Sequence, residues 1–302
     1  MEAVVDARSA HDRHRTIAIG LLLVAAVFGT ALGEPDLPVQ VTVLVAGVVL
    51  VGTPHGGLDH RAGREVLAPS FGAAWPLPFA GAYIGAAAAM VALWCALPVV
   101  GLALFLALSW AHFGEANSHG AWLVVERFAR GGIPIVAPAL AHPGDIDMIF
   151  GWMAGTDGAA LATILRGPAA WAWVPALVAY LTRTALTRAS ASLESAALTA
   201  VAVALSPLLS FTLFFCLVHA PRAMIEAGRE TGEGLLRLIR IAAPLSFAAA
   251  AMAAAGYALL VDGATPEVAA VRTVFIWLAA LTVPHMLLTS IAARARQGRG
   301  RP

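Results

Sequence analysis

Residues 38–54 read PVQVTVLVAGVVLVGTP, an apolar stretch without a charged side chain. A helix of this length rises about 25 Å, close to the ~30 Å of hydrocarbon in a bilayer. Charges, Pro and Gly divide the rest of the chain into further stretches of this kind. The predicted spans are 16–33, 38–54, 73–95, 98–114, 129–141, 167–182, 192–206, 208–221, 239–260 and 270–288. The sequence therefore predicts an all-α, polytopic transmembrane helical bundle with about 8–10 spans, the shorter ones kinked, re-entrant or fused to neighbours.

The composition supports this fold class. Residues of the AVILMFWYC set make up 60% of the 302 residues, and only 12% are charged. Soluble domains reach about 45–50% apolar residues even with glycine counted, so these side chains need a non-aqueous solvent. Two cysteines exclude a disulfide-stapled scaffold, and a net charge of +1 gives no indication of a nucleic-acid partner.

The charges predict the orientation of the bundle. With the N-terminus inside, 17 of the 19 arginines fall on the cytoplasmic side, and the external segments hold mainly acids. This positive-inside pattern predicts a multi-pass inner-membrane protein with both termini in the cytoplasm. We expect a single transmembrane domain over 1–302, with a cytoplasmic lead-in at 1–15 and a basic tail at 289–302. The stretch 142–166 is expected to be an external loop with a short helix at 148–153.

Four histidines fall at a similar depth, near the cytoplasmic ends of predicted spans: His55, His112, His219 and His285. Imidazoles inside a membrane are costly, so they usually face the bundle interior and mark a site. Neutral imidazole is also a common ligand of Fe, Zn and Cu. The alternative for each histidine taken singly is an ordinary hydrogen-bonded side chain at the membrane interface. His11, His14 and His142 are expected on the solvated surface.

Two acids accompany these histidines. Asp59 lies four residues after His55, and Glu115 lies three after His112, so a helix would place each acid on the face of its histidine. A carboxylate there would accept the ring N–H and leave the other nitrogen for a metal. The alternative is that both acids pair with nearby arginines.

Four ordered motifs carry a family resemblance: PHGGLDH at 54–60, HFGE at 112–115, FFCLVHAPR at 214–222 and PHM at 284–286. Together they resemble the Brp/Blh family of integral-membrane β-carotene 15,15′-dioxygenases. The resemblance implies an enzyme that uses O₂ and a histidine-held, non-haem Fe(2+) to split the central double bond of β-carotene. The product would be retinal, often for a microbial rhodopsin. The implied iron ligands are His55, His112 and His219.

One position departs from the family pattern. The family's third motif carries a second histidine four residues after the first, where this chain has Ala223. The fourth ligand position is expected to fall to His285, to His60 or to water.

β-Carotene is a hydrocarbon confined to the bilayer, so its cleavage also requires an apolar tunnel. Aromatic residues flank the histidines in sequence, and packing against lipid or protein is the alternative role for each. The tunnel candidates are Trp110, Phe113 and Phe215, with Phe211, Phe214, Phe275 and Trp277 also nearby.

Other classes of membrane protein use similar features. A b-type cytochrome would carry paired axial histidines, but the Gly and Pro residues around His55 favour one compact metal site. A non-catalytic transporter, or an accessory protein for rhodopsin or carotenoids, remains the main alternative. Transporters usually show internal repeats and midplane charges, whereas the charges here crowd the membrane interfaces.

Overall fold

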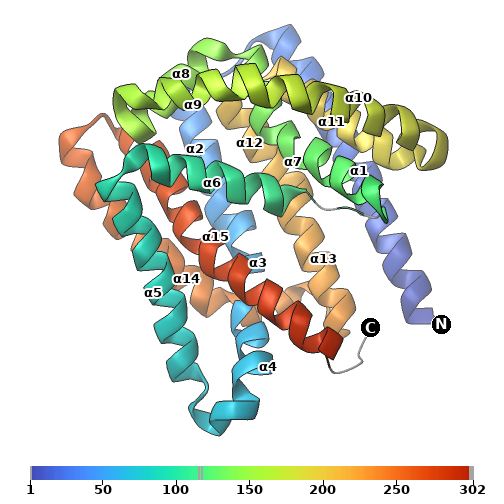
Figure 1. Ribbon diagram of the computed structural model, residues 1–302, viewed down its shortest axis with the longest axis vertical. Coiled ribbons are helices and arrows are strands. Elements are labelled where there is room, and N and C mark those ends of the chain that lie inside the picture. Colours follow the sequence, from blue (N-terminus) through green and yellow to red (C-terminus); the bar gives the residue numbers. More distant parts are fainter. Residues whose placement is uncertain (1, 115, 117, 299–302) are drawn as a thin grey trace.

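The computed structural model describes residues 2–114, 116 and 118–298, and the side chains of 10–297 within these ranges. The described chain is built from helices joined by short turns, without a β-strand (Figure 1). The α-helices are α1 Glu2–Leu32, α2 Leu37–Gly47, α3 Thr53–Gly56, α4 Asp59–Phe71, α5 Pro76–Ala96, α6 Pro98–Phe113, α7 Ala121–Ala141, α8 Pro143–Ala154, α9 Gly158–Ile164, α10 Ala170–Thr187, α11 Ala189–Ala204, α12 Pro207–Phe214, α13 Ala220–Thr231, α14 Leu235–Leu260 and α15 Pro266–Gly298. Between them lie the π-helices η1 Val48–Gly52, η4 Leu165–Ala169 and η5 Phe215–His219, and the 3-10 turns η2 Gly72–Ala74, η3 Gly155–Asp157 and η6 Val261–Gly263.

Seven helical segments of the described chain are long and apolar enough to cross a bilayer. They are Ala10–Leu32, Leu37–Ala74, Pro76–Ala96, Pro143–Thr187, Pro207–Thr231, Leu235–Gly263 and Pro266–Gln297. The chain is therefore a multi-pass membrane protein, and the predicted all-α polytopic bundle is confirmed. Large apolar side chains on the outside fit this assignment, because Leu186 and Leu259 are more than four-fifths exposed.

Ten spans were predicted, and three of these predicted spans correspond to helices that are short or buried. The predicted spans 98–114 and 192–206 correspond to α6 and α11, which have only 16 residues each. The predicted span 129–141 is the second half of α7, a helix with many buried residues and a buried acid, Glu126. These helices pack against other helices, so they need not be long enough to cross lipid alone.

The structure corrects the expected external loop at 142–166. The short helix predicted at 148–153 exists, but it is part of the longer α8, and helix continues through α9 and η4 into α10. Ile146, Ile149, Phe150 and Met153 of α8 are buried in the protein core. The acids at the start of α8 suggested a solvated loop, but α8 packs its apolar face against α6 and α7.

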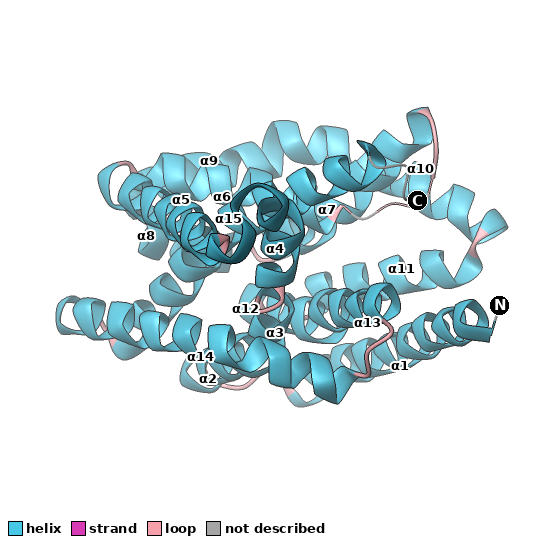
Figure 2. Ribbon diagram, turned by 90° about the horizontal axis from the view of Figure 1, so that it is seen from below, coloured by secondary structure: helices cyan, strands magenta, loops and turns pink. Residues whose placement is uncertain are grey.

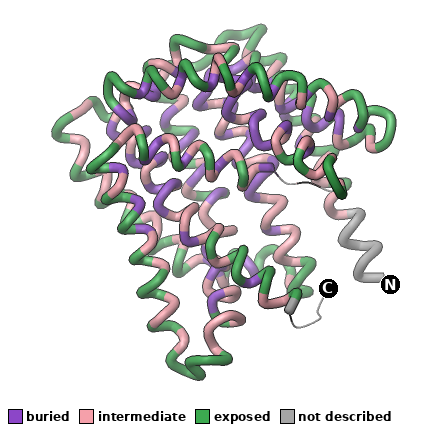
Figure 3. The backbone as a smooth tube through the Cα atoms, in the orientation of Figure 1, coloured by how far each residue is buried: buried purple, intermediate pink, exposed green. Residues whose placement is uncertain are grey.

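The helices form two layers when viewed from below (Figure 2). One layer contains α5 to α10, and the other contains α1, α2, α12, α13 and α14. Buried segments gather in the middle and upper part of the bundle, whereas α5 and the turn after α4 are largely exposed (Figure 3). His112 belongs to the first layer and His219 to the second, so the predicted site falls between the layers.

Candidate metal centre

Two π-helical segments lead into the candidate site. Pro54 follows η1 closely and precedes His55 on α3, and Pro221 follows η5, which ends at His219. Proline lacks an N–H and crowds the preceding turn, so a regular α-helical ladder cannot continue through either position. Single π-turns of this kind occur frequently at functional sites.

The two π-segments lie against each other because glycines leave room between them. A Cβ on Gly52 would lie 2.3 Å from Cε1 of Phe215, and a Cβ on Gly47 would lie 2.9 Å from Sγ of Cys216. Both distances are shorter than real Cβ contacts, and at Gly52 the overlap is large enough that any side chain would displace the Phe215 ring. The close approach places His55 and His219 side by side.

Four histidine rings form one cluster. The ring centroids of His55 and His219 are 5.3 Å apart, and those of His112 and His219 are 4.8 Å apart. His285 of α15 lies 5.7 Å from His55 and 5.3 Å from His112, again between centroids. The structure therefore brings together the four histidines that the sequence placed at one depth.

The donor atoms are close enough for one metal ion. One ring nitrogen from each of His55, His112 and His219 lies within 4.8 Å of the other two. Nitrogens at tetrahedral angles around one ion lie about 3.4 Å apart for a metal–nitrogen bond of ~2.1 Å. The three rings would therefore move together by up to about 1.4 Å to bind one ion.

Hydrogen bonds at Nδ1 leave the Nε2 atoms of His55 and His285 available. Nδ1 of His55 contacts the carbonyl oxygen of Gly52, and Nδ1 of His285 lies 2.8 Å from Oδ1 of Asp59. Because both acceptors are oxygens, each Nδ1 carries the proton and each Nε2 presents a lone pair. Nε2 of His219 is buried without a hydrogen-bond partner, as expected for an atom that binds a metal. The residues thus fit a transition metal that accepts imidazole ligands.

Asp59 supports a different histidine from the one expected. Its side chain is buried, and it accepts hydrogen bonds from Nδ1 of His285 and from the hydroxyl of Tyr83, both at 2.8 Å. The expected pairing with His55 does not form, because α3 ends at Gly56 and a turn separates it from α4. Tyr83 was not predicted as a site residue, although a lone hydroxyl in the apolar helix Pro76–Ala96 could have indicated it. Glu115 lies outside the described residues.

The other predicted histidines lie elsewhere. His60 contacts the carbonyl oxygen of Gly57 through Nδ1, at 2.9 Å. Unlike the His285 ring, the His60 ring makes no contact with the other described histidine rings of the cluster. His11 and His14 are not simple surface residues. They are partly buried, with Nε2 of His11 lying 3.4 Å from Glu226 and Nε2 of His14 lying 2.9 Å from the carbonyl oxygen of Leu217.

An apolar cavity adjoins the cluster, and Phe113 both lines this cavity and contacts the histidines. The Phe113 ring lies 5.0 Å from the His219 ring, between centroids. Of the other predicted tunnel residues, Phe215 packs on His219 and Trp110 stacks on Phe128, and neither lines the cavity. The wall is formed by Leu102, Phe105, Leu106, Ser109, Phe113, Pro134, Ile135, Pro138, Ile146, Ile149, Phe150, Met153, Pro207, Leu208, Phe211 and Phe275.

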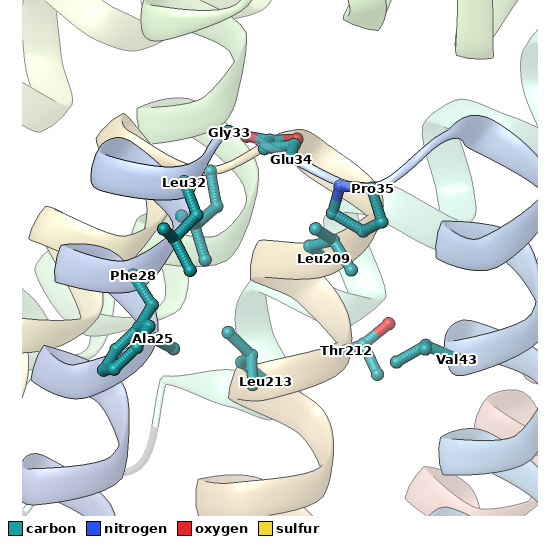
Figure 4. A pocket seen from close by; sticks show the side chains of 12 residues that line it. Ala25, Phe28, Leu32, Gly33, Glu34, Pro35, Val43, Leu209, Thr212 and Leu213 are labelled. Carbon is teal, nitrogen blue, oxygen red and sulfur yellow. The ribbon is translucent and has the colours of Figure 1, made fainter.

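The cavity is narrow in this structure. Its volume is about 60 Å³, whereas ligand pockets usually measure about 300–1,000 Å³. A larger groove of about 300 Å³ lies on the other side of α12, between α1 and α2 (Figure 4). Its lining contains no histidine, and Phe28 and Leu32 at its rim are largely exposed. The narrow cavity is therefore the one that adjoins the histidines.

Fold and site define the class of protein: a multi-pass membrane protein with a histidine cluster suited to a metal ion beside an apolar cavity. The family model described as beta-carotene 15,15′-dioxygenase matches residues 46–292. The chain belongs to this family of oxygenases, which confirms the resemblance found in the sequence.

Two curated relatives agree with this assignment. The chain is 27% identical over 273 residues to the beta-carotene 15,15′-dioxygenase of the uncultured marine bacterium 66A03, covering 84% of this chain and 94% of the relative. It is 22% identical over 311 residues to the probable beta-carotene 15,15′-dioxygenase Blh of Halobacterium salinarum, covering 91% and 89%. No solved structure matches this chain.

Proposed function

We propose that this protein cleaves β-carotene at its central double bond with O₂ to give retinal. We further propose that the reaction occurs at an Fe(2+) ion held by His55, His112, His219 and His285. The observation that carries the proposal is the group of three histidines with close donor atoms, with the His285 ring beside it and an apolar cavity adjoining it, in a chain of the beta-carotene 15,15′-dioxygenase family. With four protein ligands, bound iron would keep open positions for O₂ activation.

The protein's own residues would hold and orient the centre. Nδ1 of His55 donates a hydrogen bond to Gly52, and Nδ1 of His285 donates one to Asp59. These bonds would orient both rings so that Nε2 of each is the atom that binds the metal. The family's third motif carries a second histidine at the position of Ala223 in this chain. His285 would take the ligand position of that missing histidine. The acid Asp59 would act by orienting His285, with no proton transfer to substrate required.

The cavity would bind the polyene. Its wall is almost entirely apolar, and Phe113 places it next to the His219 ring. A rigid hydrocarbon binds favourably to such a wall, because each close apolar contact adds dispersion attraction and the molecule has no polar group to desolvate. At about 60 Å³ the cavity is too small for β-carotene, so the lining side chains must separate during binding. The buried wall would also keep water away from the centre.

The membrane in which the protein lies and the acceptor of its product are predicted from the sequence. The arginine distribution favours the inner membrane with cytoplasmic termini. A microbial rhodopsin is the predicted acceptor of retinal, because the family resemblance implies it.

The proposal is tested in a bacterial strain that produces β-carotene. We expect retinal in extracts of cells that express the wild-type protein, and none with His112→Ala. His142→Ala is the matched control, because His142 lies near Asp145 at the start of α8 and outside the cluster. Membrane levels of all three proteins are measured by immunoblotting. Intact β-carotene beside well-expressed wild-type protein would refute the proposal and favour a transport or accessory role.

A further inference from the structure

Helix α1 lies outside the residues that the family model matches, yet it contacts the segment that carries His219. It runs alongside α11 and α13 (Figures 1 and 2). Two of its contacts with these segments come from His14 and His11, in the polar first half of the helix that the sequence predicts to be a cytoplasmic lead-in.

His14 of α1 bonds the backbone of η5 directly. Nε2 of His14 lies 2.9 Å from the carbonyl oxygen of Leu217, so the ring donates an N–H to this oxygen. In a regular α-helix the donor to Leu217 would be the N–H of residue 221, but residue 221 is proline and has none. His14 thus supplies a donor to this oxygen where the α-helical donor is missing, two residues before His219.

A buried ion-pair cluster fixes the same segment from its other end. Glu194 of α11 is 2% exposed, and its carboxylate accepts a hydrogen bond of 2.9 Å from Nε of Arg15. Its second oxygen accepts one from Arg222, which lies three residues after His219. A buried carboxylate with charge-assisted bonds to two arginines is held far more firmly than a surface pair. The clamp therefore joins α1, α11 and α13.

We infer that α1 is a positioning element of the metal centre, with His14 and Arg15 as positioning residues for His219. This inference rests on the proposed function. The irregular backbone of η5 lacks part of the usual ladder, so its shape depends on bonds from other helices. Bonds to Leu217 and Arg222 flank His219 on both sides and so set where its Nε2 atom points. Loss of such supporting contacts typically weakens metal binding about 10–100-fold.

Cobalt(II) binding to the purified full-length protein in nanodiscs tests this inference. Visible absorbance reports both the affinity and the geometry of a cobalt–histidine centre, without any enzymatic turnover. We expect His14→Leu to weaken binding at least about tenfold and to change the absorbance bands. His14→Gln should restore both, because its amide can donate the same hydrogen bond. His11→Leu is the control, since His11 is on the same helix but contacts Glu226.

Equal affinity and spectra in wild type and His14→Leu would overturn the inference and leave the proposed function standing. Equal losses in His14→Leu and His14→Gln would overturn it too. A wild-type protein that binds no cobalt would instead count against the proposed centre. Hydrogen exchange of metal-free protein separates the two failures. Faster exchange over 215–222 in His14→Leu supports the α1 contact whatever the metal result, and unchanged exchange there overturns it.

Discussion

Replacing Asp59 by asparagine tests how the cluster is held. The carboxylate accepts two hydrogen bonds of 2.8 Å, one from His285 and one from Tyr83. Asparagine has nearly the same shape, so its oxygen can still accept from Nδ1 of His285. Its amide can donate to the Tyr83 oxygen. The substitution therefore removes a negative charge while it conserves packing and hydrogen bonds.

The expected cost falls on metal binding. A carboxylate behind a ligand histidine makes the ring a better donor, and loss of such a partner costs about 10–100-fold in metal affinity. This factor equals about 1.4–2.7 kcal/mol at 25 °C. Because the side chain is buried and no competing water reaches the pair readily, we expect the upper half of this range. Tyr83→Phe leaves the charge in place and should cost less.

Affinity is measured by competition between the purified protein and a chelator of known strength, with metal content determined by mass spectrometry. Thermal unfolding of the metal-free variants provides the control for folding. If Asp59→Asn binds the metal as tightly as wild type while His112→Ala does not, the carboxylate does not support the centre. A larger loss with Tyr83→Phe than with Asp59→Asn would contradict the reasoning as well.

Two further predictions concern the fourth ligand and the contact between the π-segments. His285→Ala should lower metal occupancy. Ala223→His should restore it in the double variant, because residue 223 lies one helical turn after His219. A several-fold gain in occupancy from Ala223→His alone would show that His285 does not occupy the fourth ligand position. Gly52→Ala should destabilise the protein by about 1–3 kcal/mol because its Cβ would overlap the Phe215 ring. Gly56→Ala, whose Cβ meets nothing within 4 Å, should not; equal melting temperatures for the two variants would refute the argument.

The grouping of the four histidines could be predicted from their positions in the sequence. Membrane helices must bury polar side chains in the bundle interior, so imidazoles at one depth tend to converge. The partner of Asp59 was predicted wrongly because that prediction assumed a continuous helix from His55. The turn at Gly57 and Leu58 interrupts it and directs the acid toward α15. Trp110 was expected in the tunnel by its position near His112, but its indole N–H bonds the carbonyl oxygen of Phe128 instead.

The amino-acid sequence by itself determined that the chain spans a membrane as a helical bundle, because 60% apolar residues leave no soluble alternative. It also predicted that His55, His112, His219 and His285 lie at one depth, since the apolar spans set the depth of each, although His60 stayed open as a fourth ligand. Only the tertiary structure decided that Tyr83 and Asp59 hold His285, that α8 forms a wall of the cavity, and that α1 supports η5. Each of these contacts joins residues far apart in the chain, where local spacing carries no information and helix packing alone sets the distance.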